Sequence, residues 1–440
     1  MLLIIASFGS VMLKIWYVIL AFLILMLMVT VHEFGHYLAG KLLKFKINEF
    51  AVGMGPKLLS KTRKNGEVIS LRAFPLGGYC AFEGENDDGT DNPDAFNKQK
   101  PWKRLIVLFA GAFFNFLFAV LVCFILFTAY GESVTVVGKP FGYADSAVQE
   151  LQTGDIIYEV NGKRVYLIQS VSEYLKDDQL EVTVYRQDGT FKTIKVDKQT
   201  FFLSYVSDLK RDYTLDDNGT LLTKGDQIYK IDDVYMSKNG QYGQYLSDLA
   251  VTYGSDHVCQ VTILTQNNVQ CVIPLTVDDL LLKIGVKESP YSGLGISTKT
   301  MMYKYPFGMR MGRILPFCGE TAVVVLKTLG GLFTGSTGLD EMGGPITTIA
   351  VTSQVVAAGF PAVLLLIVLI SVNLAVFNLL PVPALDGCQM VFVIIEWITK
   401  KPLKPKVQAM INGIGLIILI ALVILLDVLK VLLSNSQTVM

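Results

Sequence analysis

Two histidines and a glutamate near the N-terminus form the clearest chemical motif in the sequence. They occupy the stretch His32-Glu33-Phe34-Gly35-His36, which holds two of the chain's three histidines. Side chains four residues apart project from one face of a helix, so His32 and His36 could bind one cation. Glu33 lies on the same turn, where its carboxylate could accept a proton from a water molecule beside that cation. The spacing therefore predicts hydrolysis at a zinc ion.

A third ligand is expected near the end of the chain, because a catalytic zinc ion usually has three protein ligands. No charged residue occurs between Glu341 and Asp386, so Asp386 directly follows a long apolar stretch. Pro381 and Pro383 end that stretch and favour an extended, rigid backbone before the aspartate. Asp386 is therefore the best-placed candidate. The remaining histidine, His257, lies in a different region of the chain.

The elements that must position these residues are membrane-spanning helices. Hydrophobic residues make up 52% of the 440-residue chain, charged residues only 17%, and the net charge is zero. This composition is typical of a multi-pass membrane protein and gives no indication of a nucleic-acid partner. Apolar runs predict four spans in a lipid bilayer, at about 15–39, 105–130, 361–380 and 407–426. The first run is longer than the apolar core of a secretory signal peptide, so we interpret it as a span.

Positive charge predicts the orientation of these spans. Lysine and arginine are concentrated in the loop after the first span and in the stretch 400–406 before the fourth. The positive-inside rule places both regions in the cytoplasm, which brings His36 and Asp386 toward the cytoplasmic face. Within the first loop, residues 67–74 alternate like a strand and 75–79 predict a turn. This β-hairpin is apolar, so we expect it to re-enter the membrane region against other parts of the protein.

The region between spans two and three has the composition of a soluble α/β domain. A Gly154-Asp155 turn, a strand and an Asn161-Gly162 turn follow one another, and a weaker copy begins at Gly225-Asp226. We predict two consecutive PDZ-like domains on the extracytoplasmic side, which would bind a peptide ligand by strand addition or act only as a steric filter. Cys259 and Cys271 flank a predicted hairpin, where a disulfide is an open alternative.

The predicted fold class is thus a multi-pass α-helical membrane protein with four transmembrane helices, a re-entrant β-hairpin and extracytoplasmic PDZ-like α/β domains. The expected parts are an N-terminal membrane part (1–130), two PDZ-like domains (131–202 and 203–299), an amphipathic linker (300–355) and a C-terminal membrane part (356–440). The linker is expected to lie on the membrane surface.

Taken in order, these motifs resemble those of the site-2 protease family of intramembrane zinc metalloproteases, in particular the bacterial RseP-type group with PDZ domains. The matching segments are HEFGH, FPLGGY, GAFFN, GGPI and NLLPVPALDG. The resemblance implies a Zn2+ ion bound by His32, His36 and Asp386, with Glu33 as the catalytic acid and base. It also implies that substrate is held by Asn378, Pro381, Pro383, Asn373, Leu71, Phe74, Gly77 and Gly78. Two residues depart from the family pattern, Ala112 in place of proline and Cys388 in place of glycine.

Gly111 and Asn115 of the second span have structural roles in this interpretation, because glycine permits close helix approach and asparagine can hydrogen-bond across it. The resemblance implies an endopeptidase of the bacterial cytoplasmic (inner) membrane that cuts single-span membrane proteins, such as anti-sigma factors or signal-peptide remnants, after a prior extracytoplasmic cut. Two alternatives remain open. One is a PDZ-based membrane scaffold with a structural metal site. The other is a metal-ion transporter, although the fourth span has only Gln408 and Asn412 near its start.

Overall fold

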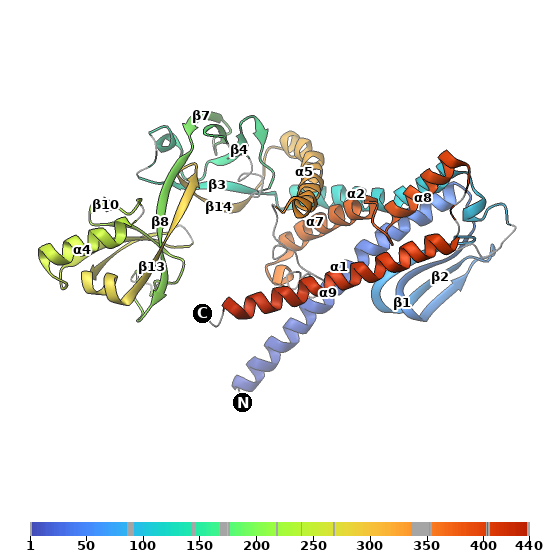
Figure 1. Ribbon diagram of the computed structural model, residues 1–440, viewed down its shortest axis with the longest axis horizontal. Coiled ribbons are helices and arrows are strands. Elements are labelled where there is room, and N and C mark those ends of the chain that lie inside the picture. The colour runs from blue at the N-terminus through green and yellow to red at the C-terminus, as the bar shows by residue number, and fades with distance from the viewer. Residues whose placement is uncertain are drawn as a thin grey trace. The chain divides into compact units, whose positions relative to one another are not determined.

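Two compact units make up the protein, a helical unit of Met1–Gly131 with Lys304–Met440 and a sheet unit of Glu132–Tyr303. Figure 1 shows the elements of both units in a computed structural model. The structure describes residues 2–437 apart from 86–91, 143, 145, 168–173, 175, 176, 217, 218, 239, 267, 268, 336–351, 353, 402 and 404. The GGPI segment and part of the predicted linker lie outside the described residues.

The helical unit contains six long helices among the described residues. They are α1 (Leu2–Leu42), α2 (Pro101–Ala129), α5 (Phe307–Thr334), α7 (Phe360–Leu379), α8 (Asp386–Thr399) and α9 (Pro405–Gln437), with a short 3-10 turn, η1 (Phe96–Lys98), before α2. Among them, four segments are long and apolar enough to cross a membrane: Ile15–Leu42, Pro101–Ala129, Phe307–Gly331 and Phe360–Leu379. The protein is therefore a membrane protein with several apolar helices.

Three of the four segments match spans expected from sequence, at about 15–39, 105–130 and 361–380. The expected fourth span, at about 407–426, lies within α9, and its described part is the apolar segment Lys406–Ala421. Helix α5, expected to be an amphipathic surface element, also has the length and composition of a span. Its charged residues Arg310, Arg313, Glu320 and Lys327 gave the sequence its amphipathic character, and Arg313 is only 1% exposed in the fold.

Helix α2 is the central element of the helical unit, since it packs against α1, α5, α7 and α8. Its buried face includes Gly111, Asn115, Ala119 and Cys123, which recur at every fourth position. Small residues on one face allow neighbouring helices to approach closely. The approach to α1 is close, since a Cβ atom added to Gly35 would lie 2.4 Å from the carbonyl oxygen of Ala110.

A small antiparallel sheet formed by β1 (Ile47–Thr62) and β2 (Val68–Phe82) follows α1. Both strands bend, so that the segment 49–52 of β1 pairs on one side with 68–71 and on the other with 78–81. The predicted strand at 67–74 is confirmed. The predicted turn at 75–79 lies where the chain reverses direction within β2, since 68–71 and 78–81 run in opposite directions beside 49–52, and Gly77 there has a φ of +82°.

The buried carboxylate of Glu67 connects this sheet to the last turns of α1. Glu67 is completely buried, accepts a hydrogen bond of 2.8 Å from the Tyr37 hydroxyl and forms an ion pair with Lys41. Arg63 also donates to the Tyr37 hydroxyl at 2.9 Å. Because Tyr37 and Lys41 follow His36 on the same helix, this cluster fixes the sheet relative to the histidine pair.

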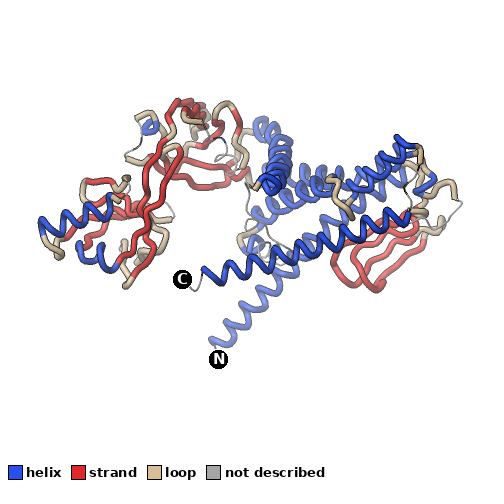
Figure 2. The backbone as a smooth tube through the Cα atoms, viewed as in Figure 1, coloured by secondary structure: helices blue, strands red, loops and turns tan. Residues whose placement is uncertain are grey.

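The sheet unit contains two six-stranded sheets with the same topology, and Figure 2 shows their strands in red. The first sheet has the order β14-β3-β4-β6-β7, with β5 paired to β4, and the second has the order β13-β8-β9-β11-β12, with β10 paired to β9. The first consists of β3 (Glu132–Pro140), β4 (Ile156–Val160), β5 (Lys163–Arg164), β6 (Gln179–Tyr185), β7 (Phe191–Asp197) and β14 (Ile296–Tyr303). The second consists of β8 (Gln199–Leu209), β9 (Gln227–Ile231), β10 (Val234–Tyr235), β11 (Val258–Leu264), β12 (Gln270–Thr276) and β13 (Ile284–Gly293), with α4 (Gln241–Tyr253) and the short turns η2 (Val148–Glu150) and η3 (Asp279–Lys283) completing the unit.

The second repeat begins with β8 at Gln199, close to the expected boundary at residue 202, but the two repeats are nested in the chain rather than consecutive. The whole second sheet lies between β7 and β14, and β14 then returns to pair with β3 from Ile296↔Pro140 to Tyr303↔Glu132. The first repeat therefore receives its edge strand only after the second repeat is complete.

The internal repeat seen in the sequence is confirmed at the level of single turns. Gly154 and Gly225 have φ values of +96° and +94°. The aspartate that follows each glycine accepts a hydrogen bond from a backbone N–H three residues earlier, at 2.9 Å for Asp155 and 2.8 Å for Asp226. Asn161 and Asp232 also correspond, since both have left-handed backbone with φ of +51° and +52°.

The structure excludes the disulfide that the sequence left open. Cys259 pairs with Leu275 across the β11–β12 ladder, whereas Cys271 pairs with Ile263, so the two cysteines are separated along the strands. All six cysteines are buried, and none of them forms a disulfide.

Candidate metal centre and active site

Three side chains from opposite ends of the chain converge in the helical unit. The Nε2 atoms of His32 and His36 lie 3.1 Å apart, as expected for residues one turn apart on α1. Asp386, the first residue of α8, places its Oδ2 atom 2.9 Å from His32 Nε2 and 3.2 Å from His36 Nε2. Both histidines are 7% exposed. The structure therefore brings together the three residues that the sequence proposed as metal ligands.

The hydrogen-bonding pattern of these atoms fits a bound cation. His36 Nδ1 lies 2.8 Å from the carbonyl oxygen of Val107, so Nδ1 carries the proton and the Nε2 lone pair faces Asp386. The Oδ2 atom of Asp386 is buried and receives no well-aligned hydrogen bond from any described residue. Lone pairs this close repel unless a positive charge lies between them. Zinc bonds of about 2.0–2.2 Å place tetrahedral ligand atoms roughly 3.3 Å apart, and two nitrogens with one carboxylate oxygen are a usual catalytic zinc set.

Two asparagines face the other nitrogen of His32. The side-chain nitrogens of Asn115 and Asn378 lie 3.4 and 3.5 Å from His32 Nδ1. Asn115 is fully buried, and its Oδ1 has no hydrogen-bond partner within the described part of the chain. The oxygen and nitrogen of an asparagine amide have nearly the same shape, so which of them faces a neighbour is decided by the hydrogen bonds that each can form. Turning the Asn115 amide by half a rotation lets its oxygen accept the His32 Nδ1 proton, which is how second-layer groups orient metal-binding histidines.

Gly111 of α2 leaves the space that the two imidazoles occupy. A Cβ atom added there would lie 2.4 Å from His36 Nε2 and 2.6 Å from His32 Cε1. The sequence predicts that Gly111 allows two helices to approach closely. In the structure the groups that approach it are the imidazoles of His32 and His36.

The backbone before Asp386 is held in an unusual conformation. Ala384 has a φ of +74°, and its N–H donates to Asn412 Oδ1 at 3.3 Å. Gly387 is required by close contact, since a Cβ atom there would lie 2.2 Å from the carbonyl oxygen of Leu380. Pro383 packs against Gly415 of α9. The proline-rich segment therefore acts as a rigid arm that sets the position of the aspartate.

A buried ion pair holds α8 against α2. Arg104 Nη1 lies 2.8 Å from Glu396 Oε2, and their side chains are 9% and 20% exposed. The guanidinium also lies over the ring of Phe96, 5.2 Å from its centre. This pair was not predicted from the sequence, although a single glutamate in the apolar stretch 391–398 is a signal for a buried partner.

Glu33 lies beside the histidines and faces the sheet. A Cβ atom added to Gly78 of β2 would come within 3.6 Å of Glu33 Cγ and 2.8 Å of the Ala51 carbonyl oxygen. Glu33 is half-buried, so it lies between the proposed metal ligands and the last segment of β2.

The residues proposed to hold substrate are less closely grouped than the ligands. Asn378 lies at the metal centre, and Gly78 lies against Glu33. Leu71 and Phe74 are 40% and 56% exposed on the sheet. Asn373 is exposed on α7, and its separation of five residues from Asn378 places it on a different face of that helix. Pro381 and Pro383 belong to the arm before Asp386, and Gly77 marks the bend in β2.

Comparison with known proteins gives one consistent answer. A family model described as peptidase family M50 matches residues 20–422. A relative from Vibrio cholerae is 27% identical over 432 residues, covering 91% of this chain and 95% of the relative. Relatives from Agrobacterium fabrum and Clostridium perfringens are also 27% identical and cover 93% and 94% of this chain, respectively. All three are provisionally named zinc metalloproteases.

Proposed function

Since the chain belongs to peptidase family M50, the site-2 protease family, and is a zinc metalloprotease, we propose that it hydrolyses peptide bonds within the transmembrane segments of single-span membrane proteins. The observation that carries this proposal is the convergence of His32, His36 and Asp386 at 2.9–3.2 Å beside Glu33, on apolar helices. Anti-sigma factors and signal-peptide remnants, already trimmed outside the membrane, are the substrate types we propose.

In this proposal His32, His36 and Asp386 bind zinc, which supplies a Lewis acid that polarises the substrate carbonyl. Glu33 accepts a proton from the attacking water molecule and donates it to the leaving amine. The contacts of His36 with Val107, and of His32 with Asn115, hold the imidazoles so that each Nε2 faces Asp386. Asn378 is placed to contact the substrate backbone beside these ligands.

The sheet next to Glu33 could form hydrogen bonds with the backbone of an unwound transmembrane substrate. A peptide bond must leave its helix before it can be cut, and each backbone group then exposed to lipid costs several kcal/mol. Within the described residues, the outer segment of β2, at 78–82, pairs with β1 on one side and has no strand on the other. We propose that substrate pairs with its open side as an added strand, guided by Leu71, Phe74, Gly77 and Gly78.

The remaining parts of the proposal concern location and control. We place the protein in the bacterial inner membrane, with the metal centre near the cytoplasmic face and the sheet unit outside. The positive charge of the stretches 40–104 and 400–406 supports this orientation. The two repeats are proposed to be PDZ-like and to act either by binding a peptide or as a filter that excludes untrimmed substrates.

The test is cleavage of a single-span protein by purified wild-type and Glu33→Gln protein in proteoliposomes, with zinc measured in both. We expect the wild type to cleave, and the variant to bind zinc without cleaving. Cleavage by the variant would refute the role of Glu33. Zinc binding without cleavage of any single-span protein by the wild type would favour a scaffold with a structural metal.

A further inference from the structure

A second group of metal-binding side chain types lies in the sheet unit. Asp232, His257 and Cys259 each offer a ligand atom, and these atoms all lie within 4.8 Å of one another. The group is separate from the metal centre in sequence and comes from the second repeat only. Cys259 is fully buried, whereas Asp232 and His257 are half-buried, so the group has one side open to solvent.

The fold positions each of the three side chains independently of any metal. His257 directly precedes β11 and Cys259 is the second residue of that strand, so the two are two residues apart in extended chain, where alternate residues face the same side. The ring of His257 also stacks on Tyr253, at the end of α4, with ring centres 4.8 Å apart. Asp232 lies in the turn between β9 and β10, where its Oδ1 accepts a hydrogen bond of 2.8 Å from the N–H of Gln260.

Within the described residues, the equivalent turn of the first repeat has no group of metal-binding side chains beside it, so it shows which hydrogen bond the turn requires. There Asn161 occupies the place of Asp232, and its Oδ1 accepts the equivalent hydrogen bond from Glu181 at 2.8 Å. When Glu181 is aligned with Gln260, the position of His257 is occupied by Asp178 in the first repeat, and the position of Cys259 by Leu180. The turn therefore needs only one side-chain oxygen, which an amide supplies. The turn itself does not use the imidazole of His257 or the thiol of Cys259, which lies in the core of the second repeat and is hydrogen-bonded to Asp232.

We propose that Asp232, His257 and Cys259 bind a second zinc ion. Nitrogen, sulfur and carboxylate ligands together suit Zn2+ and not Mg2+ or Ca2+, which prefer oxygen. A thiolate and a carboxylate also balance the two positive charges. Zinc bonds of about 2.0–2.3 Å place tetrahedral ligand atoms roughly 3.3–3.8 Å apart, so a small rotation of the side chains brings all three within reach. The fourth position faces solvent, which makes this an exchangeable site.

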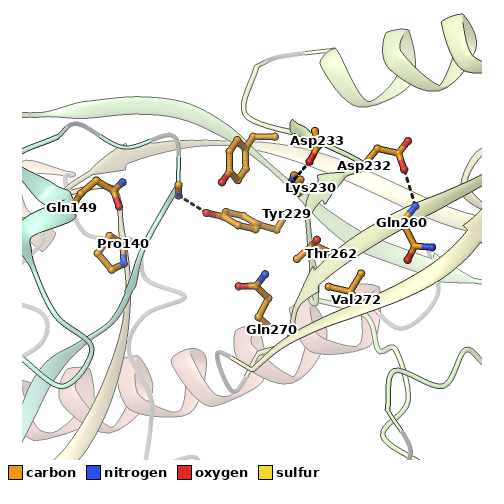
Figure 3. A pocket seen from close by; sticks show the side chains of 12 residues that line it. Pro140, Gln149, Tyr229, Lys230, Asp232, Asp233, Gln260, Thr262, Gln270 and Val272 are labelled. Atoms are coloured by element: carbon orange, nitrogen blue, oxygen red, sulfur yellow. Dashed lines mark hydrogen bonds and ion pairs between the residues drawn. The ribbon is translucent and has the colours of Figure 1, made fainter.

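The proposed site adjoins a cavity between the two repeats. Asp232 is one of the residues that line this cavity of about 480 Å3, together with Asp233 of the same turn and Gln149 of the first repeat. Figure 3 shows Asp232 at the cavity wall, with its contact to Gln260. A metal bound to Asp232 would fix the turn that forms this part of the wall.

The experiment uses the full chain in detergent with His32 and His36 both changed to alanine, so that only the second site can bind metal. The protein is titrated with Co2+, which reports thiolate binding through a sulfur-to-metal charge-transfer band, and zinc is then counted after exchange. We expect a charge-transfer band and a single zinc equivalent. Asp232→Asn, which copies the first repeat and keeps the turn, should weaken binding at least tenfold, and Cys259→Ser should abolish the band.

Cys271→Ser is the matched control, because Cys271 is also a buried free thiol of the second repeat but lies outside the group. It should leave the band and the zinc content unchanged. Absence of the band in the double-alanine background, or its persistence in Cys259→Ser, would overturn the proposal. Because the background lacks the first metal centre, these outcomes do not depend on proteolytic activity.

Discussion

Replacing Gly111 by alanine tests the position of the metal-binding histidines most directly. The added Cβ atom would lie 2.4 Å from His36 Nε2, whereas ordinary contacts of this kind begin at 3.4 Å. Either the ring or helix α2 must move by about 1 Å, and α2 cannot easily move because Gly35 already contacts its backbone. Overpacking of a tight site costs about 1–3 kcal/mol, which corresponds to a loss of zinc affinity of roughly 5- to 150-fold.

Catalysis should fall further than zinc binding, since a misplacement of about 1 Å at a reacting group costs on the order of 100-fold in rate. The assay is a zinc competition titration against a chelator, together with cleavage of a single-span substrate at saturating zinc. Gly319→Ala is the matched control, because this glycine also lies in a helix but has open space around its Cβ position. It should leave both quantities unchanged. Wild-type zinc affinity and turnover in Gly111→Ala would refute the placement of the histidines described above.

Three further predictions concern stability. Arg104→Met should lower the free energy of unfolding by about 3–5 kcal/mol by leaving Glu396 buried without its partner, and a second change, Glu396→Leu, should recover most of the loss in thermal melts. Glu67→Gln should cost about 1–3 kcal/mol and make the β1–β2 sheet more accessible to protease, because the fully buried partner of Lys41 loses its charge. Burial alone would raise the pKa of Asp279, but hydrogen bonds from Lys283 and Thr276 and the charge of Arg211 lower it below 3.8. The stability that Asp279 contributes is therefore complete above pH 3.8 and is lost as the pH falls through the lower folded-state pKa, so Asp279→Asn should flatten that part of a pH–stability curve.

Local patterns were sufficient to predict the residues of the candidate metal centre. The spacing of His32 and His36 fixes their shared helical face, and the prolines before Asp386 indicate a rigid arm after an apolar run. The structure brings these residues together because α2 packs against α1, which carries the histidines, and also against α8, which begins at Asp386. Tight packing at Gly111 and hydrogen bonding by Asn115 were also foreseen, but the identity of their partner, the histidine pair, depends on contacts between helices that no local pattern encodes.

Long-range pairing and helix burial were the parts that sequence alone could not supply. β14 pairs with β3 across a complete second repeat. In the sequence, β14 directly follows the second repeat and is therefore assigned to it. The charges of helix α5 suggest a polar face that is exposed along its whole length. In the fold Arg313 is instead buried, with its guanidinium over the ring of Tyr305. The Arg104–Glu396 ion pair was not predicted either, because its two charges are 292 residues apart in the sequence and only the fold brings them together.

The nested order of the two repeats has a consequence for how the protein is made. During synthesis the first sheet emerges without β14, so the edge of β3 remains unpaired while the second repeat is being translated. At about 5–20 residues per second, the roughly 100 residues between Asp197 and Ile296 take about 5–20 s to appear. An open edge of that kind is prone to pairing with the wrong strand, so a nascent chain at this stage is a natural client for chaperones. Gln199 and Gly293, at the two ends of the inserted repeat, pair with each other. Folding of the second repeat therefore places the chain that follows it, which includes β14, next to the unpaired edge of the first sheet.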